Sequence, residues 1–218
     1  MAELDFLKTH PGIKRDYDER AREKTPEVIK IAKKFGQEFF DGDRIYGYGG
    51  YRYDGRWLEV VERMKKHYSL ADDAKILDIG CAKGFLLHDF KKCMPRSFVA
   101  GIDVSKYAVE SSMEDIKPFL KRGSAENLPY PDKSFDLVIS INSIHNLPKD
   151  VLVQALKEIQ RVSKKHSYIT VDAWRTKEEK ENLFKWLLTA ETALHVNSWV
   201  NLFEEAGYKG DYGWFIAN

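Results

Sequence analysis

The sequence predicts an α/β protein with a doubly wound, mostly parallel sheet and an N-terminal helical cap. From Lys75 onward, short apolar runs alternate with segments of helical spacing, which is typical of parallel strands joined by helices. The first run ends in Asp78 and Gly80, at the position where such sheets bind ligands. Two helical segments come before this alternation begins, and they predict the cap.

The predicted strands are short and apolar, as strands buried on both faces are. They span 75–80, 97–105, 134–142 and 166–174. The intervening helices are predicted over 84–93, 106–120, 149–164 and 197–208. Gly207 is suited to cap the last helix, and the residues after it suffice for one more strand. The arrangement of the C-terminal sheet edge stays open at this stage.

The cap is predicted from two amphipathic segments, 24–40 and 56–68. Thr25 is a suitable N-cap for the first of them because its hydroxyl can accept a bond from the opening turn. Both segments precede the first strand. We therefore expect a helical cap over residues 1–72 and a sheet domain over 73–218.

Residues 46–57, YGYGGYRYDGRW, combine four glycines with five aromatic rings and contain no aliphatic side chain. Glycines give a segment hinges, and aromatic faces attract cations. One interpretation is a flap that closes over the site. The other is that these tyrosines pack the cap against the sheet, and both interpretations stay open for different rings.

The composition describes an ordinary globular domain with 43% apolar and 32% charged residues. The 35 basic and 34 acidic residues nearly balance, which argues against a broad nucleic-acid-binding surface and leaves only a local one open. No signal peptide or long apolar run is visible, so we expect a cytoplasmic protein with no membrane partner. Cys81 and Cys93 cannot form a four-thiolate zinc site, and we expect no metal site.

The stretch LDIGCAKGF carries the chemistry of the predicted site. Asp78 ends the first strand, and Gly80 and Gly84 open the turn into a helix whose N-terminus can face an anion. Asp103 ends the second strand about twenty residues later, where an acid can bind both hydroxyls of a ribose. A nicotinamide fold would need G-x-G-x-x-G. Ala82 replaces its second glycine, and its third is absent.

Three motifs in order resemble the class I S-adenosylmethionine-dependent methyltransferases: LDIGCAKG, GIDVS and GSAENLPYPDKSFDLVISINSIHNL. The resemblance covers residues 73–218. It implies the Rossmann-like methyltransferase fold, S-adenosylmethionine as cofactor, S-adenosylhomocysteine as its product and a methyl acceptor as the second substrate.

The resemblance also implies which residues hold the cofactor. They are Asp78, Gly80, Cys81, Ala82, Gly84, Asp103, Val104, Ser124, Ala125, Asn142 and Ile144. The Gly- and Tyr-rich stretch adds Tyr48, whose ring can face the cofactor's sulfonium. It also adds Arg56, which, like Arg52, can meet the cofactor carboxylate or an anionic substrate. Asp103 would hold the ribose, and Asn142 would lie under the sulfonium. Ser124 stands where the family usually has an aspartate that bonds the adenine amine. Cys81 is expected to be a small buried side chain and not a nucleophile, because no neighbour in sequence activates its thiol.

His145 and Asp172 are the candidate catalytic residues, because each lies at or after the end of a strand on the ligand side. His145 is a candidate base, a substrate hydrogen-bond partner or a structural histidine. Asp172 is a candidate to steady a substrate amine or hydroxyl, or merely to cap a turn.

The acceptor that we expect is an oxygen or nitrogen atom of a small polar molecule such as a sugar or an amine. One alternative is a nucleic-acid or protein methyltransferase, although INSIHNL lacks the Asn-Pro-Pro-aromatic signature of many enzymes that methylate base amino groups. The other is a non-catalytic cofactor-binding module, which turnover with any acceptor would exclude. The sequence also leaves room for a homodimer.

Overall fold

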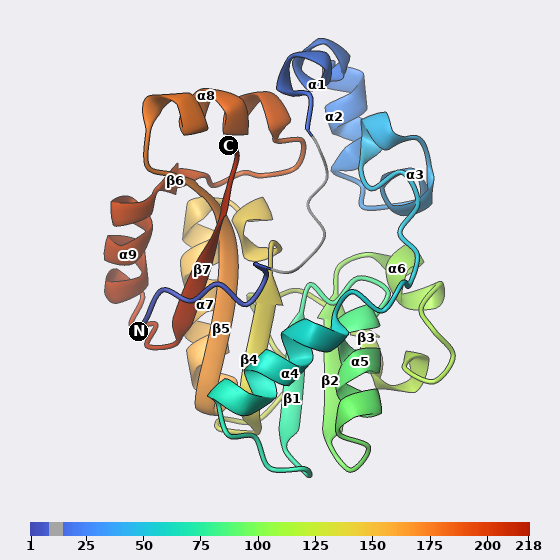
Figure 1. The fold of residues 1–218 in the computed structure, drawn as a ribbon, viewed down its shortest axis with the longest axis vertical. Coiled ribbons are helices and arrows are strands. Elements are labelled where there is room, and N and C mark those ends of the chain that lie inside the picture. The colour runs from blue at the N-terminus through green and yellow to red at the C-terminus, as the bar shows by residue number, and fades with distance from the viewer. Residues whose placement is uncertain (9–14) are drawn as a thin grey trace.

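The computed structural model describes residues 1–8 and 15–218 and confirms the predicted α/β class (Figure 1). Within these residues a seven-stranded sheet has the order β3-β2-β1-β4-β5-β6, with β7 also pairing with β5. Every strand pairing in it is parallel. The strands are β1 Lys75–Ile79, β2 Phe98–Asp103, β3 Leu120–Arg122, β4 Phe135–Ile141, β5 Ser163–Trp174, β6 Leu194–His195 and β7 Asp211–Ile216.

The helices cover both faces of this sheet and its carboxyl edge. They are α1 Tyr17–Glu23, α2 Pro26–Ala32, α3 Gln37–Asp41, α4 Leu58–His67, α5 Phe85–Cys93, α6 Lys106–Glu110, α7 Lys149–Val162, α8 Lys177–Trp186 and α9 Val196–Glu205. Short 3-10 helices lie at η1 Arg44–Tyr46, η2 Lys117–Phe119 and η3 Ile144–Asn146.

Two apolar clusters hold the helices to the sheet. Leu137 and Val138 of β4 enter opposite clusters, because successive strand side chains point to opposite faces. Helices α7 and α9 pack on one face, and α4 and α5 pack on the other. Helix α4 thus joins the sheet layer through Val61 and Met64, and α1–α3 are the helices that reach over the carboxyl edge (Figure 1). The division at residue 72 stays a prediction.

Two of the expected helices are shorter than the sequence pattern indicated. The segment 24–40 breaks into α2 and α3, because Phe35 has a φ of 47° and Gly36 starts a new helix. The segment 106–120 ends as a helix at Glu110. There the hydroxyl of Ser111 donates to a carbonyl one turn earlier, a bond that competes with helix propagation.

The C-terminal edge of the sheet is now defined. Strand β7 runs parallel to β5, and the first residues of the chain run along its other side. Leu4 N donates to Tyr212 O at 2.7 Å, and Tyr212 N donates to Ala2 O at 3.0 Å. These bonds cover an edge that would otherwise present unpaired backbone groups.

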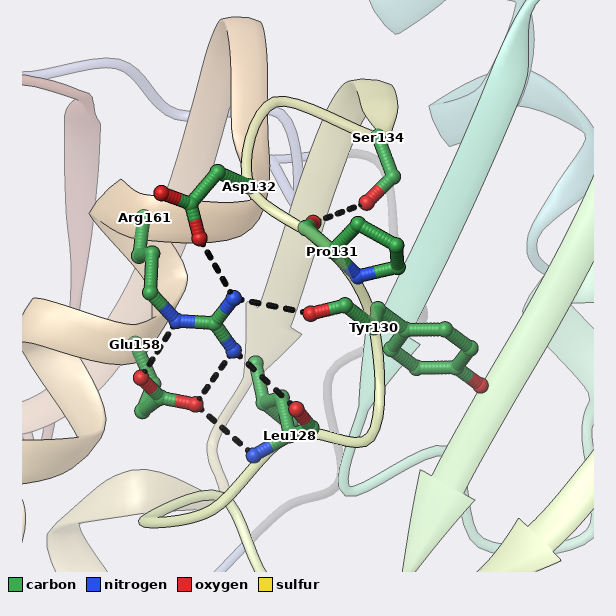
Figure 2. Close-up of polar contacts among 7 residues, drawn as sticks. All are labelled: Leu128, Tyr130, Pro131, Asp132, Ser134, Glu158 and Arg161. Atoms are coloured by element: carbon green, nitrogen blue, oxygen red, sulfur yellow. Dashed lines mark hydrogen bonds and ion pairs between the residues drawn. The ribbon is translucent and has the colours of Figure 1, made fainter.

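The connection between β3 and β4 is tied to α7 by a polar network centred on Arg161 (Figure 2). Its guanidinium donates to Glu158 at 2.6 and 2.7 Å and to Asp132 at 2.9 Å. It also donates to the carbonyls of Tyr130 and Leu128 at 2.8 and 3.0 Å. The network fixes the loop that leads away from the predicted adenine-edge residues.

None of the helices that the structure describes is long and apolar enough to cross a membrane.

Candidate functional site

A cavity of about 590 Å³ lies at the carboxyl ends of the strands, beneath the cap. It brings together nearly all the side chains that the sequence singled out. The predicted residues in its wall are Tyr48, Arg56, Asp78, Gly80, Cys81, Ala82, Asp103, Val104, Ser124, Ala125, Asn142, Ile144, His145 and Asp172. Gly84 does not line it.

The turn after β1 needs both of its glycines. Gly80 has a φ of 75°, and a Cβ there would lie 1.9 Å from Ser143 Oγ. Gly84 has a φ of 77° and begins α5, where a Cβ would lie 2.6 Å from an Ile116 methyl carbon. Both positions favour glycine for steric reasons alone. Gly84 therefore shapes the turn from behind the cavity wall.

Asp103 is held in place by backbone donors at the end of β2. Its carboxylate accepts from Ala82 N and from Ser105 N, both at 2.8 Å. Burial raises the pKa of this carboxyl, and the two backbone bonds oppose the rise. Each carboxylate oxygen keeps a free lone pair, because it can accept two hydrogen bonds. The residue is therefore oriented and still able to accept from a ligand.

Asp78 at the end of β1 is the more unusual acid. It is 4% exposed, and its carboxyl group has no hydrogen-bond partner among residues 1–8 and 15–218. Burial, followed by the nearby Asp103, raises its pKa to about 8. A buried carboxyl without a partner is costly. A cationic ligand group in the cavity would therefore relieve this cost.

Asn142 follows β4 in a strained conformation, with a φ of 49°. Its N–H donates to Thr170 O at 3.1 Å and to Thr170 Oγ1 at 2.9 Å. The Thr170 hydroxyl donates in turn to Asn142 Oδ1 at 2.9 Å. Backbone strain of this kind persists where neighbours over-determine it, as at many ligand sites.

His145 and Asp172 form a buried pair. The Asp172 backbone N–H donates to His145 Nδ1 at 3.3 Å, and His145 Nε2 lies 3.3 Å from Asp172 Oδ2. Nδ1 is thus an acceptor, so in the neutral ring Nε2 carries the proton. Burial lowers the pKa of His145, although Asp172 opposes this. Burial also raises the pKa of Asp172. Both ring nitrogens of His145 interact with Asp172. A proton leaving a substrate would therefore be accepted by the His145–Asp172 pair and not by a free imidazole nitrogen.

The rings of the Gly- and Tyr-rich stretch divide into two sets. Tyr51 stacks on Phe85 with centroids 4.8 Å apart, and the Tyr53 hydroxyl donates to Asp89 at 2.5 Å. Tyr48 is 47% exposed and lines the cavity. Tyr51 and Trp57 also line the cavity. Tyr51 therefore belongs to both sets, because it packs on α5 and stands at the site.

An ion pair and a hydrogen bond hold the cap over the turn after β1. Lys83, in that turn, contacts Asp41 of α3 at 2.6 Å, and the Tyr107 hydroxyl donates to the same carboxylate at 2.6 Å. Arg56 in the cavity wall is paired with Asp54 at 2.5 Å. A ligand anion at Arg56 would have to compete with Asp54.

Sequence reasoning missed the part of the wall that comes from the cap, from α8 and from β7. Its side chains include Arg15, Arg20, Arg44, Trp186 and Phe215. The helix that carries Trp186 had a readable signal, because Thr176 and Glu179 form a capping box. The arginines had none, since Arg15, Arg20 and Arg44 come from separate segments, two of them short helices, that meet only in the folded chain.

Within the described ranges, no group of three or more histidine, cysteine, aspartate or glutamate side chains is placed to hold a metal ion. The thiol of Cys81 is 4% exposed, and burial raises its pKa well above the ordinary value. This position suits a small buried side chain and not a nucleophile.

Comparison with known proteins agrees with this geometry. Residues 76–166 match a family model described as a methyltransferase domain. A demethylmenaquinone methyltransferase of Staphylococcus aureus is 37% identical over 110 residues, which are 47% of this chain and 44% of that protein. The chain spans between 44% and 60% of the length of the curated relatives that it matches first.

Solved structures share the fold. A putative methyltransferase from an antibiotic biosynthesis pathway of Anabaena variabilis aligns with a TM-score of 0.55 at 26% identity, covering 70% of this chain and 62% of that one. The YcgJ protein of Bacillus subtilis aligns with a TM-score of 0.54 at 21% identity, covering 67% and 66%. Both alignments support the mostly parallel sheet with flanking helices.

Proposed function

Because the chain belongs to the class I S-adenosylmethionine-dependent methyltransferase family, we propose that it transfers a methyl group to an oxygen or nitrogen atom of a small polar molecule. The observation that carries this proposal is the pair of buried acids, Asp78 and Asp103, at neighbouring strand ends in one cavity. The acceptor class rests on the enclosure of that cavity by the cap.

The residues present fit S-adenosylmethionine. Asp103, oriented by two backbone N–H groups, suits the two hydroxyls of a ribose. Asp78 lacks a cationic partner in the described chain, and the ammonium group of the cofactor's methionine part would supply one. Tyr48 offers an aromatic face to a sulfonium. When bound, the cofactor supplies an activated methyl group.

The protein's own contribution to the reaction is to place the acceptor and exclude water. We assign the acceptor side to the His145–Asp172 pair at the cavity wall. In this pair His145 orients the carboxylate through Nε2, and the other carboxylate oxygen receives a hydrogen bond from the acceptor hydroxyl or amine. A base in this position helps a hydroxyl acceptor most.

The test is methyl transfer from cofactor labelled in the methyl group into a filtered pool of low-molecular-mass metabolites. Asp172→Asn and the exposed Asp150→Asn form a matched pair of variants. We expect labelled small molecules with the wild type and with Asp150→Asn, and far fewer with Asp172→Asn. Label that enters only protein or nucleic acid would contradict the acceptor class. Cofactor binding without transfer to any of these pools would favour a non-catalytic module.

A further inference from the structure

Three arginines from separate segments surround one tryptophan in the cavity wall. The guanidinium carbons of Arg15, Arg20 and Arg44 lie 5.3, 5.5 and 5.2 Å from the centre of the Trp186 ring. Arg15 also lies 4.7 Å from the centre of the Phe215 ring. All five side chains line the same cavity as Asp78 and Asp103.

None of Arg15, Arg20 and Arg44 forms an ion pair with any residue in the described ranges. Arg20 is only 7% exposed and spends one nitrogen on the carbonyls of Arg44 and Ile45. The Nε atoms of Arg15 and Arg20 are buried without a hydrogen-bond partner.

Burial, and after it the like charge of a neighbouring arginine, lowers the pKa values of Arg20 and Arg44. Burial and then Arg44 lower the pKa of Arg20, and Glu23 opposes this without forming an ion pair. Burial and then Arg15 lower the pKa of Arg44. Uncompensated buried charge is destabilising. Of the three, Arg20 is buried, Arg15 is half-buried and Arg44 is exposed. Three guanidinium groups gathered around one ring are suited to a ligand of opposite charge.

The cluster lies away from the predicted ribose and adenine positions. Trp186 ends α8, and Phe215 lies on β7, which pairs with β5. Asp103, in contrast, ends β2, on the other side of β1 and β4. Figure 1 shows α8 on the β5–β7 side of the sheet and α3 and α6 on the β2–β3 side. Asp172 of β5 lies on the arginine side and interacts electrostatically with Arg15.

We propose that the methyl acceptor is an anion whose carboxylate or phosphate group is bound by Arg15, Arg20 and Arg44. This inference rests on the proposed function and narrows its acceptor class. Planar guanidinium forks match such oxyanions and form charge-assisted pairs with them. An anionic acceptor also offsets the positive sulfonium that the same cavity would hold. Phosphate bound at this site would lie beside Trp186 and within reach of the His145–Asp172 side of the wall.

The first experiment titrates inorganic phosphate and, separately, acetate into protein saturated with S-adenosylhomocysteine. The variants are Arg15→Gln and Arg44→Gln, and the control is Arg22→Gln, an exposed arginine of α1 outside the cavity. We expect saturable binding of at least one anion to the wild type and the control. Each cavity variant should weaken anion affinity about tenfold, which is the contribution expected of one charge-assisted hydrogen bond. A preference between the two anions distinguishes a phosphate site from a carboxylate site.

A parallel titration tests whether the arginines bind the carboxylate of the cofactor and not an anionic group of the acceptor. Both cavity variants should bind S-adenosylhomocysteine and methylthioadenosine, which lacks the amino-acid part, as tightly as the wild type does. A tenfold loss for the first nucleoside alone would assign the arginines to the cofactor and overturn the inference. So would the absence of anion binding, or equal anion affinity in all variants. If the wild type binds neither nucleoside, the proposed function fails instead, and the same anion titration of the protein without nucleoside still reports on the arginines.

The second experiment fractionates the filtered metabolite pool on an anion exchanger before methyl transfer from labelled cofactor. Label should enter compounds of the retained, anionic fraction. Transfer confined to the unretained fraction would overturn the inference while leaving the methyltransferase function intact.

Discussion

The two ends of the cavity differ in charge and in how they are built. At one end, Asp78 and Asp103 are strand-end acids, and backbone groups fix Asp103 in place. At the other end, Arg15, Arg20 and Arg44 come from the cap and gather around a ring. The acidic end is rigid because the sheet positions it. The basic end depends on how the cap docks, so acceptor choice can change there without disturbing the cofactor end.

The largest effect is expected at the acceptor side, from Asp172→Asn. If the carboxylate receives the acceptor proton, turnover should fall about 10²–10⁴-fold, while S-adenosylhomocysteine affinity stays within about 1 kcal/mol. Single-turnover kinetics and calorimetry measure the two quantities. An equal loss of nucleoside affinity would instead place Asp172 at the cofactor end.

His145→Ala sharpens the same assignment. As an orienting partner of Asp172, His145 should lower turnover less than Asp172 does and leave cofactor affinity unchanged. The ionised carboxylate is the active form, and burial raises its pKa. The wild-type rate should therefore rise with pH through an apparent pKa above the ordinary carboxyl range. A rate that is independent of pH across the acidic range, or normal kinetics in His145→Ala, would return the pair to a structural role.

The acidic end should reveal itself through proton release. With a pKa of about 8, Asp78 is mostly protonated at pH 7, and a bound ammonium group would favour its ionised form. Binding of S-adenosylhomocysteine should therefore release a proton below pH 8. Its affinity should increase as the pH rises toward 8, by at most about tenfold per pH unit. Calorimetry in buffers of different ionisation enthalpy measures this release, and Asp78→Asn should abolish it. Proton uptake in the wild type would contradict the assignment.

The same shift has a consequence for the protein without ligand. Because the folded-state pKa of Asp78 is raised, its contribution to stability is fully present below the unfolded pKa of about 4. That contribution is lost as pH rises toward 8. Bound cofactor should reduce this loss. Urea unfolding at several pH values, with and without S-adenosylhomocysteine, compares the two cases.

A smaller effect is expected away from both ends. Arg161→Ala leaves the largely buried Glu158 without its guanidinium and frees two loop carbonyls (Figure 2). The free energy of unfolding should fall by about 1–3 kcal/mol. Lys164→Ala, which removes only a long surface contact, should change it little. Equal loss in both variants would show that the network contributes nothing specific.

The smallest effect concerns residues 46–56 between the two ends. Their amides should exchange more slowly with S-adenosylhomocysteine bound than without it, most clearly near Tyr48, which is exposed at the cavity. Protection should change least around Tyr53, whose hydroxyl is already bonded to Asp89. Identical exchange in both states would favour packing as the role of the whole stretch.

The acidic and basic ends of the cavity also differ in how far the sequence predicts them. Asp78, Gly80 and Asp103 were predictable because a strand end and its turn are neighbours in sequence, and parallel topology brings strand ends together. The break at Phe35 was not, because only tertiary packing sets its left-handed conformation. Trp186 and the arginines meet through docking of α1 near α8. No local pattern encodes that meeting, so the basic end appears only in three dimensions.

The central claim is that this cavity binds S-adenosylmethionine and its product through the acidic end. Calorimetric titration of S-adenosylhomocysteine into the wild type and into Asp103→Ala tests it most directly. We expect a dissociation constant of about 1 μM, or about −8 kcal/mol. The variant should lose at least tenfold, because its ribose hydroxyls would be left without an acceptor. An unchanged affinity in Asp103→Ala, or tight binding of a nicotinamide dinucleotide in place of the nucleoside, would contradict the account.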